Sequence, residues 1–458
     1  MLAFNADPQP AATAARPDGP RHVWHPFAQM AEFGAFPPLH IVSGQGGWLR
    51  DRDGREYLDG NASIWTNVHG HNDPDLNAAL QRQLERVAHS TLLGLTHGPA
   101  EELAAELVAL APAGLDRVFY SDNGAGAVEV ALKQSFQYWQ LRGRPEKRGV
   151  IGLAGGYHGD TIGAMAAGDS GFFHERFRPW FYPAEHFSAP ECSEWNGVIR
   201  SSEMGPSLAA LERLLADQAD RTACVILEPS VQGAAGMRLQ PPGFVAAVAA
   251  LCRAHAVHLI LDEVFVAFGR LGPMCVSAAW GIEPDFLCLA KGLTGGYLPL
   301  AATLSREEIF AEFLGTYSSG KAFFHGHTFT GNPLAAAVAL ENIRKLRTQI
   351  AAGALARRIA AFGAELDRAF AGHRHVRALR QRGLAAAIDL APDRHSAEAF
   401  APDERIGLRV CLRARAHGLL LRPLGDSLLL VPPLCLDEAE LAELANRTLR
   451  ALDETLPN

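Results

Sequence analysis

Glu228, Asp262 and Lys291 each come directly after a short, mainly apolar segment of the sequence. Such segments, separated by stretches long enough for a helix, predict the buried strands of a parallel sheet. In an open parallel sheet, ligands bind beyond the carboxyl ends of the strands. We therefore expect these three side chains at one edge of a sheet, where a ligand would lie.

A carboxylate and a lysine amine at neighbouring strand ends suit one cofactor chemistry well. A lysine amine can form a Schiff base with an aldehyde cofactor, and a carboxylate can keep a pyridine nitrogen protonated, so that the ring becomes an electron sink. Lys291 and Asp262 are the candidates for these roles, and Tyr157, in a glycine-rich segment after another predicted strand, could cover the ring. A simpler interpretation stays open, because a lone acid after a strand is often a helix cap.

Pyridoxal phosphate also needs a phosphate site, and Asn123, Gly124 and Ala125 could form it. They stand between a predicted strand, Arg117–Ser121, and a predicted helix, Ala125–Gln140. Backbone N–H groups at a helix N-terminus bind phosphate. Taken alone, the Asn-Gly-Ala sequence is more typical of an ordinary turn.

The sequence lacks the local signatures of several other enzyme classes. It has no G-x-S-x-G, no G-x-x-x-x-G-K-[ST] and no H-E-x-x-H, and no G-x-G-x-x-G follows a first strand. Two His-Gly-His triplets, at residues 69–71 and 325–327, have no cysteine or carboxylate at metal-site spacing. We predict no metal site, and a nicotinamide-dependent oxidoreductase is a distant alternative.

Composition and charge exclude further functions. The 458 residues include 42 Lys and Arg against 50 Asp and Glu, a net charge of −8, which offers no electrostatic surface for a nucleic acid. The longest uncharged stretch, residues 322–340, contains two histidines, Asn332 and Pro333, so we expect no membrane span. Seven widely spaced cysteines, never paired as C-x-x-C, predict buried thiols in a reducing cytoplasm.

The predicted elements indicate an α/β fold of two domains. Residues 1–20, with four prolines and six alanines, are expected to form a disordered tail. We expect residues 21–75, which include a β-meander at 38–60, to pack with a smaller domain. Residues 76–340 are expected to form the large cofactor-binding domain, a mostly parallel sheet sandwiched by helices, and residues 341–458 the smaller α+β domain.

The smaller elements are predicted from local pattern and turn residues. Residues 345–380 and 437–452 predict helices, and turns are expected at Ser43-Gly44 and Asp53-Gly54. The predicted strands of the last third are Leu384–Leu390, Leu419–Arg422 and Ser427–Val431.

Many short segments between about His22 and Leu452 together carry a resemblance. They are Trp24–Phe27, Ser63–Trp65, Val68–His71, Ala88–His97, Val128–Lys133, Gln137–Trp139, Gly156–Gly163, Glu228 with Gln232-Gly233, Lys291–Gly296, Phe324–Pro333 and Arg422–Asp426. In these segments and in their order, the chain resembles the class III, fold-type I pyridoxal-phosphate aminotransferases. Within that family it is most similar to the 7,8-diaminopelargonic acid synthases of biotin synthesis.

The resemblance implies a role for each matching cofactor-site residue. Lys291 would be the Schiff-base lysine and proton shuttle, Asp262 would pair with the pyridine nitrogen, and Tyr157 would stack on the ring. Gly124 and Ala125 would bind the phosphate. Thr328 of the partner subunit would also bind the phosphate, so the resemblance implies a homodimer with shared active sites.

The resemblance also implies a substrate site. Trp65 would line the pocket for 8-amino-7-oxononanoate, and Arg422 would pair with the carboxylate of that substrate. Glu228 and His327 would support the site. The amino donor would be S-adenosylmethionine in most members and lysine in a bacillar subgroup, and the segments Gly295–Pro299, Lys321–His327, Asp403–Gly407 and Arg422–Asp426 favour lysine.

Two departures from the family pattern affect the predicted site. Phe265-Val266-Ala267 replaces a usual Ala-Thr-Gly run, and Leu271 stands where a Thr is usual after Arg270. Asn123 replaces a usual Ser before the phosphate glycine. Two alternatives therefore stay open: an aminotransferase for another ω-amine, and a catalytically impaired paralogue that binds the cofactor.

Overall fold

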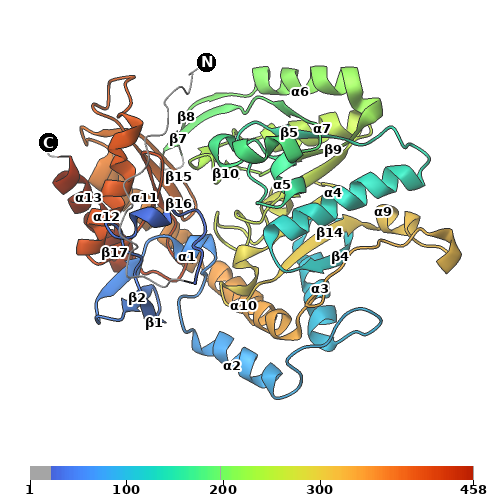
Figure 1. Ribbon diagram of the computed structural model, residues 1–458, viewed down its shortest axis with the longest axis horizontal. Helices are drawn as coiled ribbons and strands as arrows, with labels where there is room; N and C mark the ends of the chain where they lie inside the picture. Colours follow the sequence, from blue (N-terminus) through green and yellow to red (C-terminus); the bar gives the residue numbers. More distant parts are fainter. Residues whose placement is uncertain (1–21, 196–197, 457–458) are drawn as a thin grey trace.

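A seven-stranded sheet forms the centre of the larger part of the molecule (Figure 1). The computed structural model describes residues 22–195 and 198–456, and the predicted tail at 1–20 lies outside them. All strands of this sheet run parallel except β14, which is antiparallel to both neighbours. In spatial order the strands are β4 (Leu115–Ser121), β14 (Ala301–Arg306), β13 (Phe286–Leu289), β12 (His258–Asp262), β9 (Thr222–Leu227), β5 (Gly149–Leu153) and β6 (Ala184–Phe187).

Helices cover both faces of this sheet, because its strands are apolar on both sides. Ile226 and Ile260 pack with α4 (Gly124–Leu141) on one face. Their neighbours Val225 and Leu259 belong to the core on the other face, with α3 (Gly98–Leu110), α7 (Phe244–Ala254) and α10 (Pro333–Ala351). This alternation is the period of two expected for a strand buried on both sides. The predicted α/β class and the mostly parallel sheet are confirmed.

The N-terminal meander pairs with the C-terminal part of the chain. Its strands are β1 (Ile41–Gln45), β2 (Trp48–Asp51) and β3 (Glu56–Asp59), and β3 lies parallel to β17 (Leu419–Leu420). The turn predicted at Ser43-Gly44 is wrong, because β1 continues through both residues; the chain turns instead at Gly46, whose φ is +55°. The turn at Asp53-Gly54 is confirmed.

A second, antiparallel sheet of four strands lies in the last third of the chain. Its order is β15 (Val376–Arg382), β16 (Ala385–Leu390), β19 (Ser427–Leu430) and β18 (Arg422–Leu424). Helices α11 (Ala354–Phe370), α12 (Ile406–Ala416) and α13 (Glu438–Thr455) complete this part.

Two predictions in this region are wrong in detail. The helix predicted over 345–380 is interrupted at Gly353, whose φ is +67°, and ends at Phe370, after which β15 begins. The single strand predicted at 419–422 is two strands, β17 and β18, in different sheets. Helix α10 also runs across the predicted domain boundary at 340, and the domain limits stay a prediction.

Smaller elements complete the fold. The remaining helices are α1 (Ala62–Trp65), α2 (Pro74–Leu84), α5 (Ile162–Ala167), α6 (Gly205–Gln218), α8 (Val276–Ala279) and α9 (Glu307–Glu312), and two hairpins are formed by β7 (Glu191–Trp195) with β8 (Val198–Glu203) and by β10 (Val231–Gln232) with β11 (Arg238–Leu239). Among the described residues, no helix combines the length and the apolar character that crossing a bilayer requires.

One buried arginine joins the sheets around the site. Arg270 is 3% exposed, and its guanidinium donates to the carbonyls of Leu384, at 2.9 Å, and Pro432, at 2.6 Å. The same guanidinium donates to the carbonyl of Asn67 at 3.4 Å. Segments from three distant parts of the chain are thereby fixed to one side chain.

Candidate active site

A cavity of about 740 Å³ opens at the carboxyl ends of β9, β12 and β13. The three residues predicted at these strand ends, Glu228, Asp262 and Lys291, all line it. The other predicted site residues on its wall are Trp65, Gly124, Ala125 and Tyr157. The parallel sheet therefore brings together side chains that are far apart in the sequence, as predicted from the strand ends.

Lys291 begins a short 3-10 turn, Lys291–Thr294, in a strained backbone conformation. Its φ of +44° lies in the left-handed region, which costs free energy for a residue with a side chain. Its Nζ lies 5.1 Å from the ring centroid of Trp65 and 5.7 Å from that of Phe265. Desolvation lowers the pKa of the amine, and the charges of Asp262 and Glu228 oppose this shift.

Asp262 is held by a buried histidine that the sequence analysis did not single out. Its Oδ2 lies 2.7 Å from Nδ1 of His158, whose side chain is fully buried, and its Oδ1 accepts the N–H of Val264 at 3.0 Å. These bonds orient the carboxylate at the cavity wall. The signal in the sequence was that His158 directly follows Tyr157 in the glycine-rich segment.

Glu228 ties the Tyr157 loop to the sheet. It accepts the backbone N–H groups of Tyr157, at 3.2 Å, and Gly233, at 2.9 Å. Burial raises the pKa of Glu228 to about 7, although the nearby His158 and the two N–H groups oppose the shift. Burial likewise raises the pKa of the Tyr157 phenol, which donates to Asp160 at 2.9 Å.

The predicted phosphate site lies at the N-terminus of α4. Asn123, which replaces the family's usual Ser, is the helix cap, and its Oδ1 accepts the N–H of Gly126 at 2.8 Å. A Cβ on Gly124 would lie 2.7 Å from Cγ1 of Val264, so a side chain does not fit there. This N-terminus of a long helix, with backbone open to the cavity, fits the phosphate of the cofactor.

Trp65 reaches the cavity from a left-handed turn. Residues 62–65 all have positive φ, from 46° to 68°, although none is glycine. Asp59 is 2% exposed and supports this turn by accepting from the hydroxyl of Ser63, at 2.8 Å, and the N–H of Asn61, at 3.2 Å. The ring centroids of Trp65 and Phe265 lie 4.6 Å apart. Phe265, one of the residues that depart from the family pattern, therefore forms part of the same cavity wall as Trp65.

Three predicted site residues are not among the described residues that line the cavity. Arg422, on β18, is exposed; its guanidinium lies 5.9 Å from the ring of Phe27, and its charge partly opposes the raised pKa of Tyr157. His327 lies 3.1 Å from Asp122, which does line the cavity. Thr328 is exposed beside it.

Large apolar side chains are exposed near Thr328. His89 packs on the ring of Phe329, with ring centroids 4.7 Å apart, and Asn332 donates to the carbonyl of Ala88 at 3.5 Å, so residues 88–95 and 324–332 lie against one another. The exposed apolar residues of these two segments are Leu93, Leu95, Phe324 and Phe329. Exposed apolar side chains gathered on neighbouring segments are typical of an interface.

Comparison with known proteins places the chain in a family. The aminotransferase class-III family matches residues 30–452. The adenosylmethionine-8-amino-7-oxononanoate aminotransferase of Geobacter sulfurreducens is 46% identical over 423 residues, 92% of this chain and 93% of that protein. The protein of the same name from Anoxybacillus flavithermus is 41% identical over 438 residues, 95% of each chain.

Comparison with solved structures leads to the same family. The crystal structure of adenosylmethionine-8-amino-7-oxononanoate aminotransferase from Methanocaldococcus jannaschii superposes with a TM-score of 0.89 at 37% identity, over 94% of this chain and 97% of that one. An (S)-enantioselective omega-transaminase from Thermomicrobium roseum gives 0.88 at 32% identity, over 95% and 97%.

The chain belongs to the class III aminotransferases. It is an enzyme of the fold-type I group that depends on pyridoxal phosphate. The lysine, carboxylate, aromatic ring and helix N-terminus on the cavity wall are the groups that such a cofactor needs.

The raised pKa of Glu228 predicts a pH dependence of stability. The pKa near 7 keeps the folded carboxyl protonated up to about that pH, whereas an ordinary glutamate carboxyl, as in the unfolded chain, loses its proton near pH 4.5. Wild-type stability is therefore expected to fall as the pH rises through this window, on the order of 3 kcal/mol for this group. Glu228→Gln does not titrate, so its free energy of unfolding relative to wild type should increase between pH 4.5 and 8. Urea unfolding of the cofactor-free proteins measures this; parallel pH curves would contradict it.

Proposed function

We propose that the enzyme transfers an amino group to 8-amino-7-oxononanoate and forms 7,8-diaminononanoate for biotin synthesis. The observation that carries this proposal is the similarity, over more than nine-tenths of the chain, to relatives named as aminotransferases of that substrate. A cavity with an aromatic wall at Trp65 and an arginine nearby suits a long apolar chain that ends in a carboxylate. We propose that the enzyme works in the cytoplasm.

In this proposal, each residue of the cavity wall has one task toward the cofactor. Pyridoxal phosphate supplies an electron sink when bound. Nζ of Lys291 would hold it covalently and, once a substrate amine has released it, the free amine would move a proton between the two carbon atoms involved in the transfer. Asp262 would keep a proton at the pyridine nitrogen. Tyr157 covers one face of the ring, and the N-terminus of α4 at Gly124 and Ala125 binds the phosphate.

A lowered pKa at Lys291 supports the proton-transfer role. A neutral amine can accept a proton, and desolvation favours the neutral form. Glu228 and His158 support the site indirectly, because they fix the loop that carries Tyr157 and the carboxylate of Asp262.

We also propose a homodimer in which each subunit completes the site of the other. Thr328 is exposed and is not among the described residues that line the cavity of its own subunit, so it is available to the site of a partner. The exposed apolar residues around it, among them Phe324 and Phe329, supply the apolar surface that such an interface buries. His327, paired with Asp122, anchors the segment at the cavity rim.

The amino donor has two candidates, lysine and S-adenosylmethionine. The segments noted in the sequence, such as Lys321–His327, favour lysine, whereas the relatives carry adenosylmethionine in their names. Similarity to omega-transaminases keeps a third possibility open, a class III enzyme for another ω-amine, and the Phe265 wall is the feature that would alter substrate choice.

The absorbance of the purified yellow holoenzyme tests the donor and the acceptor in turn. We expect the visible band to disappear with lysine or with S-adenosylmethionine, but not with both, and to return when 8-amino-7-oxononanoate is added. A band that responds to neither donor would favour another amine or an impaired paralogue. A band that disappears but is not restored by the oxo acid would contradict the proposed acceptor.

Arg422→Ala tests the proposed carboxylate anchor. The bound substrate would desolvate its charged pair with Arg422. Removing one partner of a desolvated pair costs about 2–5 kcal/mol, so kcat/KM for the oxo acid should fall by about 30-fold to several thousand-fold. The donor half-reaction, which does not use this carboxylate, should change little. Arg409→Ala, an exposed arginine on α12, is the matched control and should leave both half-reactions unchanged. Equal oxo-acid kinetics in Arg422→Ala and wild type would show that another group binds the carboxylate.

A further inference from the structure

A buried asparagine on α10 binds the backbone of the turn that carries Lys291. Asn342 is 0% exposed, and its Nδ2 donates to the carbonyls of Gly292 and Leu293, both at 2.9 Å. One carboxamide NH₂ group thus gives its two hydrogens to two successive peptide groups, directly after the lysine. Its Oδ1 accepts no hydrogen bond of ordinary geometry from the residues that the structure describes.

The turn needs such support because its backbone conformation is costly. Lys291 has a φ of +44°, and Gly295 and Gly296 follow with φ of +64° and +86°. Side-chain-bearing residues persist in the left-handed region only where the surroundings fix them. Within the turn itself, the N–H of Leu293 donates to the carbonyl of Ala290 at 3.0 Å, and the N–H of Gly295 donates to the carbonyl of Gly292 at 3.1 Å. Asn342 adds a second donor to the carbonyl of Gly292 and, from outside the turn, a donor to the carbonyl of Leu293.

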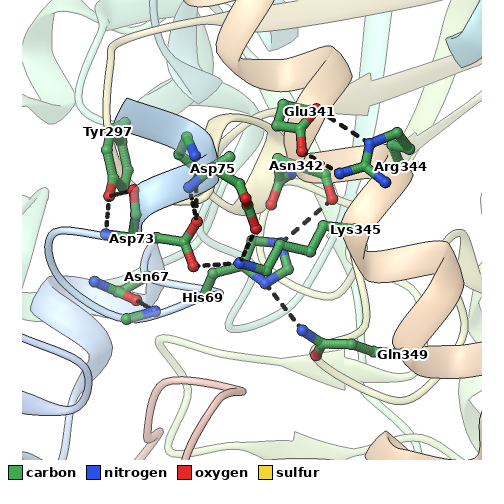
Figure 2. Close-up of polar contacts among 12 residues, drawn as sticks. Asn67, His69, Asp73, Asp75, Tyr297, Glu341, Asn342, Arg344, Lys345 and Gln349 are labelled. Carbon is green, nitrogen blue, oxygen red and sulfur yellow. Dashed lines mark hydrogen bonds and ion pairs between the residues drawn. The ribbon is translucent and has the colours of Figure 1, made fainter. Parts of the chain in front are cut away.

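Asn342 can fix the turn because its own helix is held in place. Figure 2 shows that Lys345, one turn further along α10, points toward Asp73 and Asp75 at the start of α2, and it forms ion pairs with both. His69 joins the same network, with Nε2 3.3 Å from the carbonyl oxygen of Asn342 and Nδ1 3.4 Å from the amide of Gln349. The carboxamide therefore projects from a rigid base.

We infer that Asn342 is a positioning residue for Lys291: its amide holds the 291–294 turn so that Nζ faces the cavity between Asp262 and the Trp65 wall. This inference rests on the proposed role of Lys291. The residue acts on the backbone, so its loss displaces the amine without removing any group that contacts the substrate. A displacement of about 1 Å of a reacting group can cost about 10²-fold in rate.

The experiment uses Asn342→Asp, a variant of nearly the same shape. Its ionised carboxylate donates no hydrogen and repels both carbonyl oxygens, whereas its protonated carboxyl can donate one. Burial raises the pKa of a carboxyl group, so we expect the change at a higher pH than for an ordinary aspartate. We expect the ratio of variant to wild-type kcat to rise as the pH falls, with KM for the amino donor within about 3-fold of wild type.

Two further variants separate positioning from folding. Asn342→Leu removes the donors at every pH, and its kcat should be lower by about 10²-fold throughout. Ile343→Ala is the matched control: it removes a buried apolar side chain from the next position of α10 but no hydrogen bond to the turn. It should lower the melting temperature without changing kcat or its pH profile.

The holoenzyme spectrum gives a readout independent of turnover. A displaced Lys291 should shift the pH midpoint at which the visible band of the bound cofactor changes in Asn342→Asp and Asn342→Leu, but not in Ile343→Ala. The inference is overturned if the Asn342 variants lose only thermal stability, with the spectral midpoint and the pH profile of kcat equal to those of wild type. Lys291→Ala shows whether only the role of Asn342 fails or the proposed role of Lys291 fails as well. Turnover retained in Lys291→Ala would contradict the proposed role of Lys291 itself.

Discussion

The structure depends on placing one half-buried lysine amine beside two carboxyl groups. Desolvation lowers the pKa of Lys291, while Asp262 and Glu228 raise it again, so the three groups set the protonation of the site together. The parallel sheet makes this possible, because it delivers each side chain at the end of a different buried strand. The helices on both faces then keep those strands in register.

Backbone strain is concentrated around the same cavity. Lys291 and the residues 62–65 turn that carries Trp65 have positive φ without being glycine. Each is supported by a buried polar side chain, Asn342 for the first and Asp59 for the second. The cost of these conformations is therefore offset by hydrogen bonds from elements outside the site, as is common where function requires a fixed geometry. Phe265 packs against Trp65 in the same cavity wall.

The sequence predicted the large sheet well because its strands are continuous apolar segments between helices. It predicted the strand-end residues of the cavity for the same reason, since position at the carboxyl end of a parallel strand follows from topology. The errors occurred where the local pattern is ambiguous. β15 (Val376–Arg382) has no regular alternation and begins soon after α11 ends, and β1 passes through a glycine that resembled a turn.

Residues that act through tertiary contacts were not predicted. His158 meets Asp262 across 104 positions of sequence, and Asn342 meets Gly292 across 50, so no local spacing reveals either pair. The one available signal for Asn342 was a polar residue at a position of α10 whose helical neighbours, Ala339 and Leu346 among them, are apolar and buried. Arg422 was named only through the family resemblance, because an exposed arginine on a short strand has no distinguishing local pattern.

The central claim is that the cofactor is held by Lys291, and chemical mapping tests it directly. The chain has few competing amines, since its lysines are Lys133, Lys147, Lys291, Lys321 and Lys345. Reduction of the holoenzyme with borohydride, followed by proteolysis and mass spectrometry, locates the residue that carries the cofactor. We predict the added mass on the peptide that contains Lys291. The same mass on any other lysine, or on none in a yellow protein, would contradict the account.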